Sequence, residues 1–152
     1  MDSTDYGVRY YGDSVLPAPG EHDLRSLVVE AVSRLPADVR EWLLEDTAHV
    51  FLGGSGQSAE YIELAVHPSE FEGGFARVRL IYLSERLATE PRDQVLWTVA
   101  HEIAHSRLAH AAGGHDAECE ADDLVRAWGF AEPPDRGEER KKYPKSARRV
   151  AG

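Results

Sequence analysis

The stretch that decides the fold is "DQVLWTVAHEIAHSRLAH", residues 93–110. Its apolar side chains recur at the spacing of an α-helix, and the glycines of the following "AAGG" predict where that helix ends. His101 and His105 stand one helical turn apart within it. On a helix this offset rotates the second side chain by only about 40°, so both imidazoles project to one side and could bind a single metal ion. Glu102 lies on the adjoining flank.

The order His101-Glu102-x-x-His105 is the pattern in which two histidines hold zinc and the glutamate acts on a water bound to it. Zinc lowers the pKa of such a water to around 7, so a hydroxide nucleophile becomes available at neutral pH. Glu102 is therefore the candidate general base. An exposed helix with incidental histidines would account for His110 but accounts poorly for the ordered motif. The metal also needs a third protein ligand, which must come from further along the chain.

Two residues downstream could be that third ligand, His115 and Glu118. Glu118 and Asp122 are four positions apart on a predicted helix over residues 116–130, so they face the same way. Glu118 could then reach the zinc while Asp122 accepts a hydrogen bond from the outer N–H of a ligand histidine, as zinc-bound histidines usually require. We therefore favour Glu118 and keep His115 as the alternative. Two histidines and one glutamate leave a fourth position for water, the arrangement of catalytic zinc.

The sequences "HEIAH" (101–105) and "ECEAD" (118–122) together resemble the gluzincin zinc metallopeptidases, especially the Ste24/HtpX type, and are similar to the ImmA/IrrE regulatory peptidases. The resemblance covers residues 97–130 and implies a minimal, zincin-like metalloprotease. Ste24/HtpX enzymes are membrane proteins, whereas this sequence has no apolar run long enough for a membrane span, so we expect a soluble form. It implies these roles: metal ligands His101, His105 and Glu118, general base Glu102, and a supporting carboxylate at Asp122. Asp122 stands where the ImmA/IrrE pattern has Asn. SprT/Wss1-like proteases use a third histidine, which keeps His115 open as a ligand, and His110 is kept as an auxiliary acid.

The rest of the chain predicts an α+β fold with a small, mostly antiparallel three-stranded sheet packed on helices. Helical spacing begins at residue 24 and again at residue 36, and period-two alternation marks three short strands at 47–54, 59–67 and 75–84. Related zincins lay the substrate along an edge strand of the sheet. We expect the segment 75–83 to supply that edge, with 59–67 as the alternative.

Charge divides the chain into a body and a tail. We expect residues 1–131 to form a single zincin-like domain, with 1–20 as an extended lead-in, and residues 132–152 to form a basic, flexible tail. The net charge is −10, yet residues 136–152 carry seven basic and two acidic side chains, 7 − 2 = +5, which leaves −15 on the remainder. The acidic body disfavours nucleic acid. The tail could also fold back on this acidic body.

The single cysteine, Cys119, excludes an internal disulfide and suits a reducing compartment. The N-terminus does not resemble a signal peptide, and no apolar run approaches the roughly 20 residues of a membrane span, so we expect a cytoplasmic protein. We expect a hydrolase, a zinc metalloendopeptidase with a narrow or regulatory range of peptide or protein substrates. The alternative is a non-catalytic protein-interaction module that Zn2+ stabilises.

Overall fold

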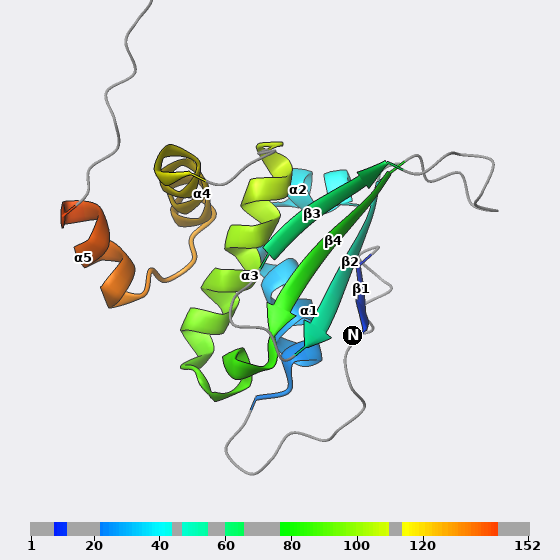
Figure 1. The fold of residues 1–152 in the computed structure, drawn as a ribbon, viewed down its shortest axis with the longest axis horizontal. Coiled ribbons are helices and arrows are strands. Elements are labelled where there is room, and N and C mark those ends of the chain that lie inside the picture. The colour runs from blue at the N-terminus through cyan, green and yellow to red at the C-terminus, as the bar shows by residue number, and fades with distance from the viewer. Residues whose placement is uncertain are drawn as a thin grey trace, which may run out of the picture.

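The computed structural model describes residues 8–11, 22–43, 47–54, 60–65, 77–109 and 114–142. Figure 1 shows a sheet with helices packed against it. The elements are, in chain order, β1 (Val8–Tyr11), α1 (Leu24–Arg34), α2 (Ala37–Leu43), β2 (Thr47–Gly54), β3 (Glu60–Ala65), β4 (Arg77–Ser84), the 3-10 helix η3 (Glu85–Thr89), α3 (Arg92–Arg107), α4 (His115–Ala127) and α5 (Pro134–Lys142).

The sheet has four strands in the order β1-β2-β4-β3 (Figure 1). β1 runs parallel to β2, and β2 runs parallel to β4, whereas β3 and β4 are antiparallel. The expected sheet of three mostly antiparallel strands is therefore wrong in strand number and in strand direction. The positions of β2, β3 and β4 do coincide with the three segments of period-two sequence.

Two features of the sheet explain this error. β1 is only "VRYY", too short for a periodic pattern to stand out within the lead-in. β4 enters between β2 and β3, so the two strands that follow each other most closely in the sequence are not neighbours. β4 is thus an internal strand, and the expectation that it offers a free edge to a peptide is wrong. The edge strands are β1 and β3.

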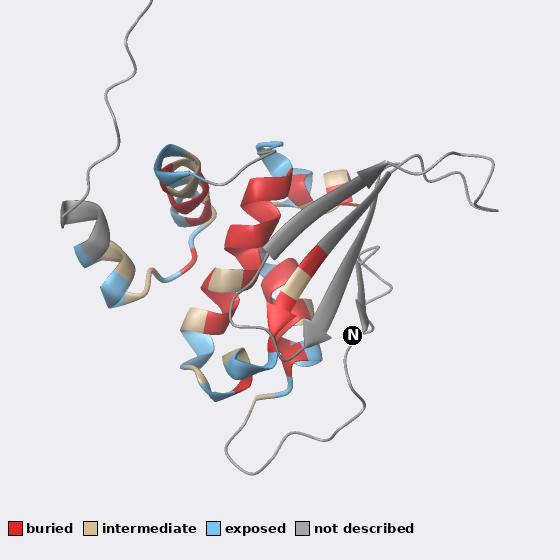
Figure 2. Cartoon of the chain, viewed as in Figure 1, coloured by how far each residue is buried: buried red, intermediate tan, exposed pale blue. Residues whose placement is uncertain are grey.

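α3 is the central helix of the described part of the chain, because it contacts α1, β3, β4 and α4. Buried apolar side chains surround its axis, and Figure 2 shows most of its ribbon as buried. These side chains include Val95, Leu96, Trp97, Val99 and Ile103. A helix that is apolar on all sides belongs in the interior.

No helix among the described ranges is long and apolar enough to span a membrane.

α4 packs against α3, and small side chains are buried on both helices. Ala100 and Ala104 on α3 and Ala121 on α4 are each 0% exposed. This packing brings Glu118 and Asp122 of α4 against the histidines of α3.

A cap at the end of α4 turns the chain back toward α3. Gly129 has φ +88°, a conformation that glycine adopts without steric cost. Its N–H donates to the Arg126 carbonyl at 3.0 Å, and the N–H of Phe130 donates to the Val125 carbonyl at 3.4 Å. Phe130 then enters the hydrophobic core. The segment that leads into α5 is therefore anchored on both sides of the glycine.

α5 lies within the segment expected to be a flexible tail. Its first residue is Pro134, a position at which the fixed φ of proline favours a helix. The sequence that follows, "DRGEERKK", consists mainly of charged residues with good helix propensity. Pro134–Lys142 thus form a helix within this segment, and a high charge density does not by itself distinguish an exposed helix from a disordered segment. Residues 143–152 lie outside the described residues.

Candidate metal centre

His101 and His105 lie one turn apart on α3, with the edge of one ring against the face of the other. Their ring centroids are 4.6 Å apart and the ring planes meet at 87°. The two Nε2 atoms are 3.0 Å apart, and both residues are buried. Because the lone pairs of two imidazole nitrogens repel each other, such a contact needs a shared proton or a bound cation.

Glu118 on α4 completes a group of three converging side chains. Its Oε2 lies 2.9 Å from His101 Nε2, and its Oε1 lies 3.1 Å from His105 Nε2. Within the described residues, His101, His105 and Glu118 form the group whose donor atoms could hold a metal ion. Hydrogen bonds with the two histidines hold the pKa of Glu118 well below its usual range, so this side chain is a carboxylate.

Asp122, one turn after Glu118 on α4, contacts the other nitrogen of His101. Its Oδ1 lies 2.9 Å from His101 Nδ1, and both side chains are 5% exposed. Burial alone would lower the pKa of His101, but the contacts with Asp122 and Glu118 raise it to about 9. A carboxylate in this position fixes the orientation of a metal-binding imidazole. With Nδ1 directed to Asp122, Nε2 of His101 is directed to the other two members of the group.

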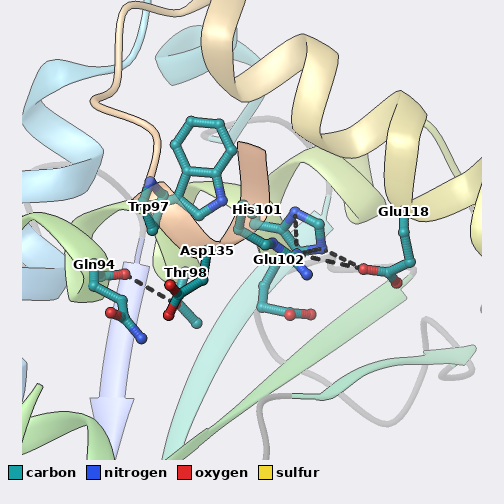
Figure 3. A pocket seen from close by; sticks show the side chains of 9 residues that line it. Gln94, Trp97, Thr98, His101, Glu102, Glu118 and Asp135 are labelled. Atoms are coloured by element: carbon teal, nitrogen blue, oxygen red, sulfur yellow. Dashed lines mark hydrogen bonds and ion pairs between the residues drawn. The ribbon is translucent and has the colours of Figure 1, made fainter. Parts of the chain in front are cut away.

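Glu102 follows His101 on α3 and is also buried, with 7% of the residue exposed. Burial raises the pKa of its carboxyl above the ordinary value, although His101 and His105 oppose this shift. A carboxylate with a raised pKa is a stronger base. Figure 3 shows Glu102 beside His101 in the wall of a pocket.

This pocket, of about 360 Å³, lies next to the three-residue group. It falls within the size range of small-ligand sites. Its walls come from α3, from Glu118 on α4 and from the beginning of α5 (Figure 3). The lining residues are Gln94, Trp97, Thr98, His101, Glu102, Glu118, Pro133, Asp135 and Arg136. The group can thus be reached from a space large enough for part of a peptide.

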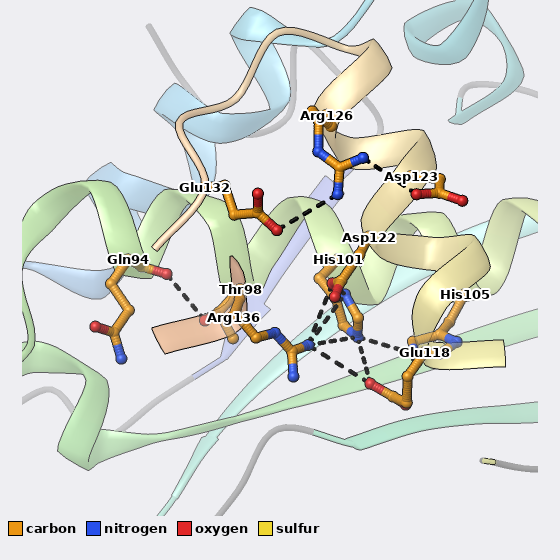
Figure 4. Close-up of polar contacts among 10 residues, drawn as sticks. All are labelled: Gln94, Thr98, His101, His105, Glu118, Asp122, Asp123, Arg126, Glu132 and Arg136. Carbon is orange, nitrogen blue, oxygen red and sulfur yellow. Dashed lines mark hydrogen bonds and ion pairs between the residues drawn. The ribbon is translucent and has the colours of Figure 1, made fainter. Parts of the chain in front are cut away.

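Arg136 on α5 reaches the same group, and sequence reasoning missed it. Its Nη2 lies 3.3 Å from His101 Nε2, 3.5 Å from Glu118 Oε2 and 3.4 Å from Asp122 Oδ1 (Figure 4). The only signal in the sequence was that the basic tail could fold back on the acidic body. That signal cannot single out one arginine, because the contact depends on how the chain turns after α4.

Of the remaining candidates, His115 does not join the group. It is the first residue of α4, is exposed, and its Nε2 lies 3.6 Å from the Sγ of the buried Cys119. His110 lies outside the described residues, so its expected auxiliary role stays a prediction. Glu118, rather than His115, is therefore the residue that the fold brings to the two histidines.

No family model matches the chain, and neither a curated protein nor a solved structure matches it. The H-E-x-x-H motif and the geometry of the residues around it are therefore the features from which a function can be inferred.

Proposed function

We propose that the chain is a zinc metallopeptidase that hydrolyses peptide bonds in a narrow range of peptide or protein substrates. One observation carries the proposal: donor atoms of His101, His105 and Glu118 converge at 2.9–3.1 Å beside the buried carboxyl of Glu102. The gluzincin identity and the zincin-like fold belong to the same proposal. Their support is the H-E-x-x-H motif on α3, followed by a glutamate on α4.

The donor set suits zinc. Zinc binds imidazole nitrogen and carboxylate oxygen at about 2.0–2.2 Å, so two ligands of a tetrahedral site lie roughly 3.3 Å apart. The separations of 2.9–3.1 Å in this group are close to that value. Structural zinc normally has four protein ligands, many of them cysteines. The group among the described residues has two histidines and one glutamate, which leaves a fourth position for water or substrate.

The residues of the pocket have distinct parts in hydrolysis. A divalent cation held by the group would polarise the substrate carbonyl and activate a water molecule. Glu102 accepts a proton from the water as the water oxygen bonds to the carbonyl carbon. Glu102 then gives this proton to the amide nitrogen as the C–N bond breaks, so the carboxylate is regenerated. Asp122 keeps the imidazole of His101 oriented throughout.

β3 is the strand best suited to hold an extended substrate. It lies at one edge of the sheet, where its outer backbone groups have no partner strand among the described residues, and it contacts α3. A peptide can add to such an edge by backbone hydrogen bonds. β1 is the other edge strand, but its helix contact is with α1. The segment 59–67, the alternative to 75–83 in the sequence-based expectation, is thus the better candidate for the substrate-binding edge.

The test compares the zinc-loaded wild type with Glu102→Gln on a library of unstructured peptides. We expect about one zinc per chain in both proteins and a loss of about 10²- to 10⁴-fold in cleavage rate in the variant, because the amide cannot accept the proton. Glu41→Gln, a change at an exposed position on α2, serves as the matched control and should cleave as the wild type does. Zinc binding without any cleavage that depends on Glu102 would favour the non-catalytic interaction module instead.

A further inference from the structure

Arg136 is the one lysine or arginine among the residues that line the pocket in the described part of the chain. Its contacts with His101, Glu118 and Asp122 all involve Nη2 and all measure 3.3–3.5 Å. These distances are at or beyond the long end of a hydrogen bond. Figure 4 shows the other terminal nitrogen directed away from the three partners. The guanidinium is therefore held near the metal-binding group without a short bond to it.

The segment before Arg136 fixes where this guanidinium lies. Phe130 is packed in the core, and Glu132 Oε1 lies 3.4 Å from Arg126 Nη2 on α4. The N–H of Arg136 donates to the Pro133 carbonyl at 3.1 Å, in the first turn of α5. A donor placed in advance costs no reorganisation when charge develops beside it.

We propose that Arg136 is a catalytic residue that donates a hydrogen bond to the carbonyl oxygen of the scissile peptide bond. This inference rests on the proposed peptidase function. If His101, His105 and Glu118 hold a cation, a carbonyl oxygen that it polarises would lie within reach of Arg136, because Arg136 contacts two of these three ligands, His101 and Glu118. As the water oxygen bonds to the carbonyl carbon, one electron pair of the C=O bond moves onto this oxygen. The negative charge returns to the C=O bond when the C–N bond breaks and the nitrogen takes the proton from Glu102.

The contacts that Arg136 Nη2 makes with His101, Glu118 and Asp122 are long enough for a shorter bond to replace them. A charge-assisted hydrogen bond to an oxyanion is typically about 2.7–2.9 Å long, shorter than the contacts that Arg136 makes in this structure.

The experiment uses the zinc-loaded full chain and two probes. The first is a peptide phosphonamidate, whose tetrahedral anionic group imitates the oxyanion, and the second is the uncharged peptide of the same sequence. We expect Arg136→Ala to weaken phosphonamidate binding about 100-fold in calorimetry and to change binding of the uncharged peptide less than about threefold. In turnover, kcat should fall about 10²- to 10³-fold with little change in KM, the usual effect of losing one oxyanion donor. Arg136→Lys should keep part of the phosphonamidate affinity and part of the kcat of the wild type.

Arg34→Ala is the matched control, because Arg34 pairs with Glu30 on α1 and does not line the pocket. It should bind both probes as the wild type does. Unchanged phosphonamidate binding in Arg136→Ala, or none in the wild type, would overturn the inference. So would a faster variant, since the arginine would then be a block on the site. If the wild type binds the phosphonamidate through Arg136 but cleaves no peptide, the peptidase proposal fails while the anion-binding role stands.

Discussion

Residues from different helices determine the charge of His101. Asp122 and Glu118 on α4 contact its two nitrogens, and together they raise its pKa to about 9 against the effect of burial. Arg136 adds a positive charge from α5. In the absence of metal the histidine is therefore a buried cation, so protons and a metal ion compete for its Nε2.

The metal-free protein should lose stability as the pH rises. The folded pKa of His101, about 9, lies above its ordinary value of 6.5, so its proton stabilises the fold fully below pH 6.5. That contribution is lost as the pH rises through 9. We expect the free energy of unfolding to fall by about 3 kcal/mol over this interval, in urea titrations with a chelator present. His101→Gln should remove most of this decrease, and a wild type that gains stability over the interval would contradict the assignment.

Asp122 should govern how tightly the site binds metal. Asp122→Asn removes the negative charge beside His101 Nδ1 while keeping the side-chain size. We expect zinc affinity to fall about 10- to 100-fold, the usual cost of losing a carboxylate that supports a ligand histidine. Competition with a chromophoric chelator measures this. Asp38→Asn, at an exposed position on α2, is the control, and equal affinities in the two variants would show that Asp122 has no such role.

Individual site residues could be predicted when their spacing along one helix determines their direction. His101 and His105 are one turn apart on α3, and Glu118 and Asp122 are one turn apart on α4. Each pair must face one side of its helix, whatever the rest of the fold does. Arg136 could not be predicted in this way, because its position follows from the chain reversal after α4.

At the scale of elements, this reversal decides where α5 lies. The Gly129 backbone has φ +88°, and no atom lies within 4 Å of where a Cβ would be. Substitution there would thus be opposed by backbone strain and not by a clash. Gly137 differs, because it lies within α5 and an added Cβ would meet only Glu132 Oε2, at 3.9 Å. Substitution by alanine should therefore have opposite effects on stability at these two positions.

Gly129→Ala should destabilise the protein by about 1–2 kcal/mol, the cost of a left-handed conformation for an alanine. For a chain of this size, each 1 kcal/mol corresponds to a fall of roughly 2–4 °C in Tm. Gly137→Ala should instead stabilise α5 by up to about 1 kcal/mol, since alanine favours helices over glycine. Thermal unfolding tests the first change, and hydrogen exchange of the α5 amides tests the second. Destabilisation of similar size in both variants would show that the strain is not specific to Gly129.

At the scale of the whole molecule, the decisive feature is that α3 contributes both to the hydrophobic core and to the candidate metal centre. Ile103, between the two histidines, is 0% exposed. Ile103→Ala should destabilise the protein by about 2–5 kcal/mol, because it leaves a cavity in a packed interior. Leu108, just after α3, is 38% exposed, and Leu108→Ala should stay within about 0.5 kcal/mol of the wild type. Equal effects in chemical unfolding would contradict a central position for α3.

The sequence predicted most helices and the positions of three strands, because hydrophobic periodicity reports which face of each element is buried. It failed on the order and direction of the strands. Periodicity is a local property, whereas the insertion of β4 between β2 and β3 depends on contacts between distant segments. The same limit applies to α5, whose charged sequence gives no sign of the pocket that it covers.

The most direct test of the central claim, an open zinc centre on α3 and α4, is a crystal structure of the zinc-loaded protein. Anomalous diffraction at the zinc edge locates the ion. We predict one ion within about 2.3 Å of His101 Nε2, His105 Nε2 and a Glu118 carboxylate oxygen, with no fourth protein ligand. An ion enclosed by four protein ligands, for instance with His115 or Cys119 among them, would contradict the claim, as would an ion bound elsewhere.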